Sequence, residues 1–306
     1  MLLNVDRAQR LMDARSLDGV IASTLENCFY LTGAASDGQE QYPYDTEAFV
    51  VATRDKPGAG TIVSGVGGSP IRLDAYDSVT DVFVYGTHYR EVAPDVELTP
   101  DEAWVNQVAV DGPRSENAFE ALCAAIEKTG LSKAAVGVDE RGPTLDLLGR
   151  LQGRFPEMRI EPAFALFRQI RMVKTPDELK RLRGALRGTE RGILAVGDAA
   201  KAGVTERDMA QQARAAMTLA GCLPLWATVR FGRNMAFGVT PSDTKLSKGD
   251  YIFFDVGCTY QGYRSDIGRL YSYGEPSEKL RRPGGRDDPP GVRVTLAVRA
   301  EDLVDD

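Results

Sequence analysis

Two aspartates, Asp255 and Asp266, have the spacing and the surroundings of metal ligands. Asp255 follows the apolar run Ile252–Phe254, and a carboxylate at the end of a buried run needs a partner. Asp266 begins a second strand-like run, and the connecting residues Cys258–Gly262 are few enough to form a hairpin that brings both side chains to one face. Carboxylate oxygens bind divalent cations, and bridging carboxylates hold the ions of a dinuclear centre about 3.5–4 Å apart. The pair predicts the first half of a two-metal hydrolytic site, although two aspartates in a hairpin also occur by chance.

The sequence offers few further ligands for such a site. A dinuclear centre needs additional side chains, usually His and Glu, because two carboxylates supply at most four oxygens. The single histidine, His88, lies far upstream and is expected to be a solvated loop residue. We therefore expect weak or absent metal binding, and we identify no catalytic residue from the sequence.

The composition is that of a soluble globular protein. The 306 residues are 43% apolar and 26% charged, which corresponds to about two domains. The net charge of −7 argues against a nucleic-acid or membrane partner. No apolar run approaches the ~20 residues that span a bilayer, and no signal peptide is readable. We expect a cytoplasmic protein with reduced thiols, because its four cysteines form no CxxC pair: Cys28, Cys123, Cys222 and Cys258.

Residues 1–162 alternate helical and strand patterns, which favours a layered α/β domain over an all-β domain. Helices are expected at 5–18, around 119–126 and shortly after Pro143. Strands are expected at 20–23, 47–53, 61–64, 104–110 and 134–138.

Residues 163–282 form a second region with an α+β pattern. A helix begins at the capping sequence Thr175–Glu178, and its expected buried stripe consists of Leu179, Leu182, Leu186 and Ile193. A second helix begins at Thr205–Asp208, where Asp replaces the usual Glu of a capping box. Three strands of an antiparallel sheet are then expected at 225–231, 251–256 and 266–273.

Four motifs, in the same order, resemble the creatinase, prolidase and Xaa-Pro aminopeptidase family of pita-bread metallohydrolases. They are Asn27–Gly33, Arg171–Glu178, Lys248–Gly257 and Gly262–Arg269, and the likeness covers about residues 5–282. The resemblance implies a three-layer α/β creatinase-type N-terminal domain followed by an α+β pita-bread domain. It also implies a homodimer, a peptide or small amide substrate, and a dinuclear manganese, cobalt or zinc centre with five side-chain ligands. By position, Asp255 and Asp266 match the first two ligands.

The chain departs from this family at several positions. The other three family ligands, one His and two Glu, have no counterpart after residue 282. A further family histidine belongs in the segment 232–238, where this chain continues Phe237-Gly-Val239. Gly268 also replaces a threonine that is often found two positions beyond the second aspartate.

Residues 283–306 differ in kind from what precedes them. They contain no aromatic residue, and proline, glycine and acidic residues separate their few apolar side chains. They therefore bury too little apolar surface to offset the entropy lost on ordering. They are either a natural disordered tail or an aberrant segment that follows a reading-frame change. We favour the second interpretation, in which the C-terminal half of the pita-bread domain is missing.

Three functions remain open. The chain is interpreted first as a metal-dependent hydrolase of the Xaa-Pro peptidase or creatinase type, inactive in this truncated form. The alternatives are a non-catalytic binding or oligomerisation module on the same fold, and a small-molecule amidohydrolase.

Overall fold

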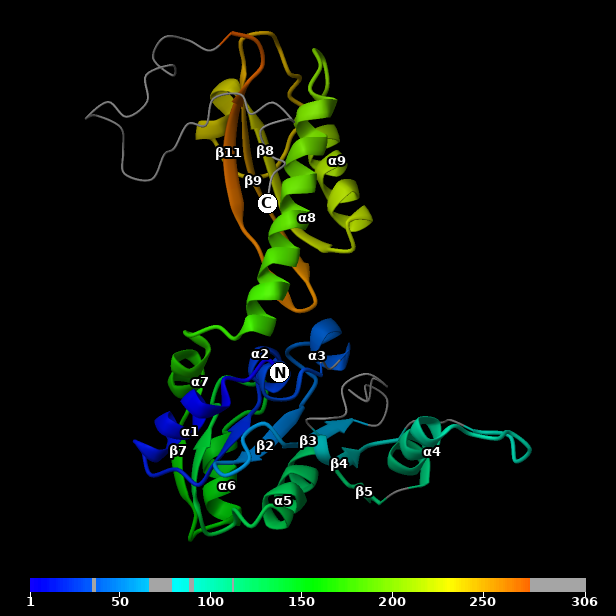
Figure 1. Cartoon of the computed structure of the whole chain (residues 1–306), viewed down its shortest axis with the longest axis vertical. Coiled ribbons are helices and arrows are strands. Elements are labelled where there is room, and N and C mark those ends of the chain that lie inside the picture. The colour runs from blue at the N-terminus through cyan, green and yellow to red at the C-terminus, as the bar shows by residue number, and fades with distance from the viewer. Residues whose placement is uncertain (35–36, 66–78, 88–90, 112, 276–306) are drawn as a thin grey trace. The chain divides into compact units, whose positions relative to one another are not determined.

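The computed structural model describes residues 1–34, 37–65, 79–87, 91–111 and 113–275. The chain divides into two compact units between Asp177 and Glu178 (Figure 1). His88 and residues 283–306, about which the sequence makes predictions, lie outside the described residues. Within the described parts of the chain, no helix is long and apolar enough to cross a membrane.

The first unit contains a mixed seven-stranded sheet with the strand order β5-β4-β3-β2-β1-β6-β7. The central strands β1 and β2 pair antiparallel, as do β2 and β3, whereas the outer neighbours pair parallel. The strands are β1 (Gly19–Ala22), β2 (Phe49–Thr53), β3 (Gly60–Gly65), β4 (Val79–Tyr85), β5 (Arg114–Ser115), β6 (Ala135–Val138) and β7 (Arg159–Pro162).

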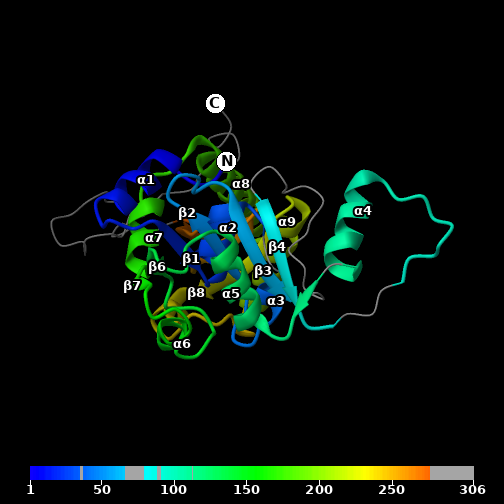
Figure 2. The same cartoon turned by 90° about the horizontal axis from the view of Figure 1, so that it is seen from below.

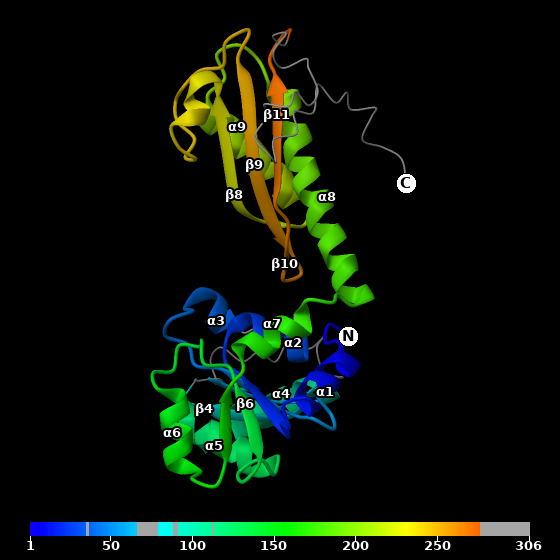
Figure 3. The same ribbon diagram turned by 90° about the vertical axis from the view of Figure 1, so that its left-hand side faces the viewer.

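Helices cover both faces of this sheet (Figures 1 and 3). On one face, α5 and α6 pack over alternate strand residues such as Ile21, Val51 and Val136. The other face lies under α1, α2 and α7, and Gly137 of β6 closely approaches Ala163 at the start of α7. The layered α/β organisation is thus the predicted one. The helices are α1 (Val5–Asp13), α2 (Leu25–Thr32), α3 (Asp37–Gln41), α4 (Pro100–Asn106), α5 (Ala118–Lys128), α6 (Leu147–Arg154) and α7 (Phe164–Arg171).

The strand predicted at residues 104–110 is wrong. This segment continues α4 into a π-helical turn, Gln107–Asp111, beyond β4 and β5 at one edge of the sheet (Figure 2). The helix starts at a capping box, in which the Thr99 N–H donates to Glu102 Oε2 at 2.9 Å, and Pro100 occupies its first turn. These start signals outweigh the β-favouring Trp and Val residues that follow.

The second unit packs two helices on one face of an antiparallel sheet (Figure 3). The central strand β9 (Tyr251–Tyr260) pairs with β8 (Leu223–Phe231) on one side and with β11 (Ile267–Ser272) on the other. The short strand β10 (Tyr263–Arg264) folds back onto the end of β9. The helices are α8 (Pro176–Ala199) and α9 (Glu206–Leu219), and a 3-10 turn, Gly232–Ala236, follows β8.

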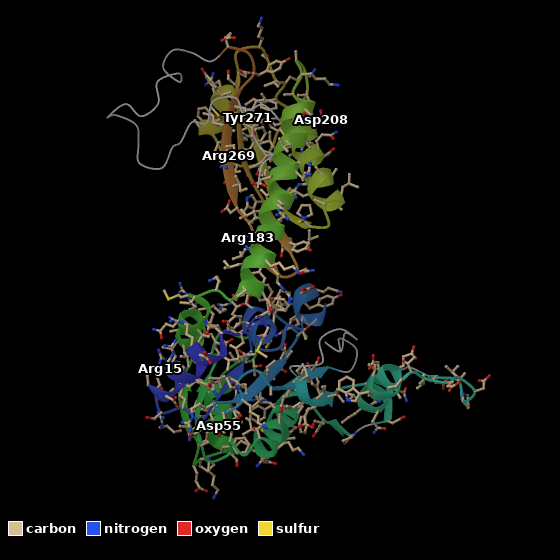
Figure 4. The ribbon with its side chains drawn as sticks, in the orientation of Figure 1. Arg15, Asp55, Arg183, Asp208, Arg269 and Tyr271 are labelled. Atoms are coloured by element: carbon tan, nitrogen blue, oxygen red, sulfur yellow. The ribbon has the colours of Figure 1, made fainter. Side chains whose placement is uncertain are left out.

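Ile252, Phe254 and Val256 of β9 point toward the helices and form the core of this unit. Tyr271, labelled in Figure 4, comes from β11. Its ring contacts Phe254 edge to face, with ring centroids 5.2 Å apart. The α9 capping box is present as predicted, with Thr205 Oγ1 donating to Asp208 Oδ2 at 2.7 Å. The α+β pattern of the second region is therefore present.

The buried stripe predicted for α8 is only partly right. Ile193 is buried, but Leu179 and Leu186 are 41% and 40% exposed. The face that packs inward carries Gly184, Gly188 and Gly192 instead, and side chains at these positions would overlap Tyr260, Cys222 and Met217. Small residues four apart let the helix approach its neighbours closely, so glycines rather than leucines mark the buried face.

Candidate metal site

The β9–β11 hairpin brings Asp255 and Asp266 to the same face of the second sheet. Asp255 pairs with Gly268, and Val256 pairs with Ile267. The register therefore sets Asp266 opposite Gly257, two residues along β9 from Asp255 and on the same side of the sheet. This side faces away from α8 and α9, because Phe254 and Val256 point toward them.

The turn of this hairpin is tighter than the sequence analysis expected. β9 continues to Tyr260, which pairs with Tyr263, so only Gln261 and Gly262 lie between the paired strands. Both have positive φ, 48° and 82°. A two-residue turn of this kind matches the twist of the flanking strands and fixes their register. The turn thereby fixes which residues of the returning chain lie beside Asp255.

The two carboxyl groups influence each other electrostatically. Removal from water, the charge of Asp255 and a hydrogen bond with Asp255 raise the pKa of the Asp266 carboxyl above its usual value. Two carboxylates that repel each other at short range form a favourable environment for a dication. The oxygen-only donor set fits a hard cation, although within the described residues no group of three or more His, Cys, Asp or Glu side chains could hold a metal ion.

Trp226 is a neighbour of the pair that the sequence analysis missed. Its indole N–H donates to Asp255 Oδ1 at 3.1 Å. The strand predicted at 225–231 contains Trp226, but only the register between β8 and β9 reveals that the ring lies beside Asp255. No pattern within residues 223–231 signals this contact, because it depends on the pairing of two strands that are distant in the sequence.

A polar cluster holds the chain just before Asp266. The Ser265 hydroxyl lies 2.6 Å from Thr189 Oγ1 of α8 and donates to the Ala185 carbonyl at 3.0 Å. The Ser265 N–H also donates to the Cys258 carbonyl at 3.0 Å. These buried contacts tie the residue before Asp266 to both α8 and β9, and so restrict where the carboxylate can lie.

Residues 232–242, which follow β8, are held by the buried carboxylate of Glu206. This carboxylate accepts hydrogen bonds from the Phe231 N–H at 2.8 Å and the Ser242 N–H at 2.9 Å, and it pairs with Arg230. The segment in which the resemblance leads one to expect a histidine lies here. Its Phe237 side chain is 69% exposed.

Residues 180–283 match metallopeptidase family M24. This part of the chain is similar to that family. The M24 family implies a divalent metal, and the matched segment contains both Asp255 and Asp266.

Two dipeptidases and one solved structure illustrate the similarity. The Xaa-Pro dipeptidase of Lactobacillus helveticus is 32% identical over 136 residues, which cover 43% of this chain and 37% of that protein. The Xaa-Pro dipeptidase of Lactobacillus delbrueckii subsp. lactis is 24% identical over 285 residues, covering 91% of this chain and 68% of that protein. The X-Pro aminopeptidase from Thermotoga maritima MSB8 superimposes with a TM-score of 0.65 at 20% identity, covering 90% of this chain and 67% of that one.

The solved structures establish the fold of this chain. It is of the creatinase/prolidase type, with an N-terminal mixed α/β sheet and a C-terminal pita-bread region. The chain spans about two thirds of the length of the aminopeptidase and a smaller share of the first dipeptidase.

Proposed function

We propose that this chain carries part of the active site of a metal-dependent peptidase that cleaves peptide bonds of the Xaa-Pro type. One observation carries the proposal: within the segment that matches family M24, Asp255 and Asp266 lie on one face of a register-fixed hairpin. Both relatives compared above are named as Xaa-Pro dipeptidases. Two carboxylates on neighbouring strands form a rigid oxygen donor set.

In the proposed site, Asp255 and Asp266 would hold the divalent ion. A divalent ion supplies a Lewis acid and lowers the pKa of a bound water, which is the chemistry that amide hydrolysis needs. The chain's own residues orient the donors: Trp226 holds one oxygen of Asp255, and Ser265 is anchored to α8 just before Asp266. The site lies on the sheet face that the helices leave uncovered.

We propose further that the 306-residue chain binds this ion weakly and has no peptidase activity. Two carboxylates provide fewer ligands than a dinuclear centre requires, and His88 is the one histidine in the sequence. Manganese, cobalt and zinc are the candidate ions. The homodimer, the cytoplasmic location and the small-amide alternative stay predictions.

A second candidate function is a non-catalytic binding or oligomerisation module. It is favoured by the segment 232–239, where Phe237 and Val239 are 69% and 67% exposed and no histidine is present. Exposed apolar side chains suit contact with a partner better than proton transfer.

Titration of the metal-free chain with Mn²⁺ tests the first function against the second. We expect weak binding that Asp255→Ala and Asp266→Ala each abolish. Asp198→Ala is a matched control, because Asp198 is an exposed aspartate of α8 in the same unit. Binding that survives both site substitutions would refute the metal site, and hydrolysis of an Xaa-Pro dipeptide by the 306-residue chain would refute its proposed inactivity.

The origin of residues 283–306 has a separate test. The nucleotide sequence around codons 280–284 and in the other frames downstream distinguishes a reading-frame change from a natural tail. A downstream frame that encodes one His and two Glu within apolar, strand-like runs would support the reading-frame interpretation.

A further inference from the structure

An irregularity in β8 aims Trp226 at the candidate metal site. β8 and β9 pair from Leu223 to Phe231, but the register shifts between Pro224 and Trp226, so that Leu225 has no partner on β9. An extra residue of this kind bends the strand and re-aims the side chains beside it. As a result, Trp226 lies directly opposite Gly257.

Gly257 leaves the space that the indole ring occupies. A Cβ atom at this position would lie 2.6 Å from Trp226 Cη2 and 2.5 Å from the Ser265 carbonyl oxygen. Both distances are far below van der Waals contact, so any side chain here would displace the ring or the backbone before Asp266. The glycine therefore leaves room for the indole ring beside β9.

The three residues form a row across the sheet, with Gly257 between Trp226 on β8 and Asp266 on the returning chain. Asp255 lies two residues from Gly257 along β9, on the same face of the sheet. From the β8 side, the indole Nε1–H reaches Asp255 Oδ1 at 3.1 Å, a normal hydrogen-bond length. The bond engages one carboxylate oxygen and leaves Oδ2 to another partner.

We propose that Trp226 is a positioning residue for Asp255. It holds Oδ1 and so keeps the Asp255 carboxylate, which would be a ligand of the divalent ion, in one orientation toward Asp266. The inference rests on the proposed function, because it requires Asp255 to be a metal ligand. Partners that orient metal ligands in this way typically change metal affinity by about 10–100-fold when they are removed.

The test uses the 306-residue chain with Mn²⁺ alone as the probe and tryptophan labelled with ¹⁵N. The chain has two tryptophans, so its spectrum contains two indole N–H signals, and Trp104→Phe assigns them. We expect Mn²⁺ to broaden the Trp226 signal selectively. We also expect Asp255→Asn to shift that signal in the absence of metal, because the substitution replaces the charged acceptor of the indole N–H.

Trp226→Phe keeps an aromatic ring over Gly257 but removes the N–H donor. We expect it to weaken Mn²⁺ binding by about tenfold, whereas Trp104→Phe in α4 leaves the affinity unchanged. If Trp226→Phe lowers the stability of the fold, the Asp255→Asn shift still tests the hydrogen bond in a chain with an intact ring.

Two outcomes overturn the inference, and only the second also overturns the proposed metal site. If Trp226→Phe binds Mn²⁺ as tightly as the unaltered chain while Asp255→Ala loses binding, the positioning role is wrong and the metal site stands. If Asp255→Ala and Asp266→Ala bind as the unaltered chain does, the proposed metal site is wrong and the inference fails with it.

Discussion

Glu206 and Arg230 form an ion pair inside the second unit, with Oε2 and Nη1 3.0 Å apart and side chains that are 0% and 8% exposed. Burying two charges is costly, and the cost is offset only when the remaining lone pairs and protons also find partners. Here they do: Glu206 accepts from the Phe231 and Ser242 N–H groups, and Arg230 donates to the carbonyls of Asn234 and Thr240. The pair thereby fixes the connection between β8 and β9.

We expect Glu206→Ala to lower the free energy of unfolding by about 3–5 kcal/mol, because it leaves the Arg230 guanidinium buried without a counter-charge. Urea denaturation measures the change. Glu190→Ala, which removes an exposed glutamate of α8, is the control and should change stability by less than about 0.5 kcal/mol. A loss for Glu206→Ala no larger than the control's would show that the pair does not stabilise the unit.

The same carboxylate makes stability depend on pH. Burial alone would raise the pKa of Glu206, but hydrogen bonds from Ser242, Phe231 and Asn234 outweigh it and hold the pKa below 4.5. A folded-state pKa below the unfolded one adds stability that is present above the unfolded value and is lost as pH falls through the folded value. We therefore expect acid to destabilise the chain below about pH 4.5, and Glu206→Gln to lose less stability across this range. Parallel pH profiles for the two proteins would contradict the expectation.

Gly188 and Gly197 both lie in α8, but we expect replacement by alanine to have opposite effects on stability at the two positions. A Cβ at Gly188 would overlap Cys222 Sγ and lie 3.2 Å from Cys258 Sγ. Around a Cβ at Gly197, by contrast, none of the described residues outside the neighbouring helix backbone has an atom within 4 Å. We expect Gly188→Ala to destabilise by about 1–3 kcal/mol through overpacking. Gly197→Ala should stabilise by up to about 1 kcal/mol through helix propensity. Thermal unfolding of both variants measures the difference, and Cys222→Ala should partly restore Gly188→Ala.

The thiols predicted to be reduced are free and buried. Burial, followed by a hydrogen bond and charge interaction with Cys258, raises the pKa of Cys222 to about 11. A thiol with this pKa forms almost no thiolate at pH 8, and only the thiolate reacts. We expect iodoacetamide to leave the native thiols unmodified at pH 8 and to modify all four in denaturant. Rapid labelling of Cys222 in the folded chain, located by peptide mass, would argue against this packing.

The sequence predicts a domain border at residue 162, whereas the first compact unit ends at Asp177. The two borders differ in which N-terminal fragment should be stable by itself. A fragment 1–162 lacks α7, whose Leu166, Phe167 and Ile170 are 0%, 0% and 1% exposed. Burial of each such side chain contributes about 1.5–3 kcal/mol. We expect the fragment 1–177 to unfold cooperatively and the fragment 1–162 to be several kcal/mol less stable. Equal stability in urea would favour the earlier border.

Local signals in the sequence predicted the elements of the second unit well. The capping sequences at Thr175 and Thr205 precede the first residues of α8 and α9. At α9 the Thr205 hydroxyl accepts from the Asp208 N–H, which satisfies a backbone group within the same turn. The proximity of Asp255 and Asp266 was also predictable, because both lie in one hairpin. Interactions of this kind depend on residues that are close in the sequence.

Features that depend on distant partners were missed. The inward face of α8 was assigned to Leu179 and Leu186, because hydrophobic periodicity gives weight to large side chains and none to glycine. The bond from Trp226 to Asp255 depends on a register shift in β8, which no pattern within residues 223–231 reveals. The segment 104–110 was misread because its apolar residues suit a strand as well as a helix.

The two-residue turn at Gln261 and Gly262 determines where this chain tolerates changes in length. Because strand side chains alternate between faces, one inserted residue in this turn would slip the returning chain by one position and direct Asp266 toward the helices. In the connection from β8 to β9, the exposed residues 237–239 carry no such requirement, since β8 pairs with β9 independently of the length of this segment. A library of insertions should therefore recover metal-binding chains with altered lengths in that segment and none with an altered turn.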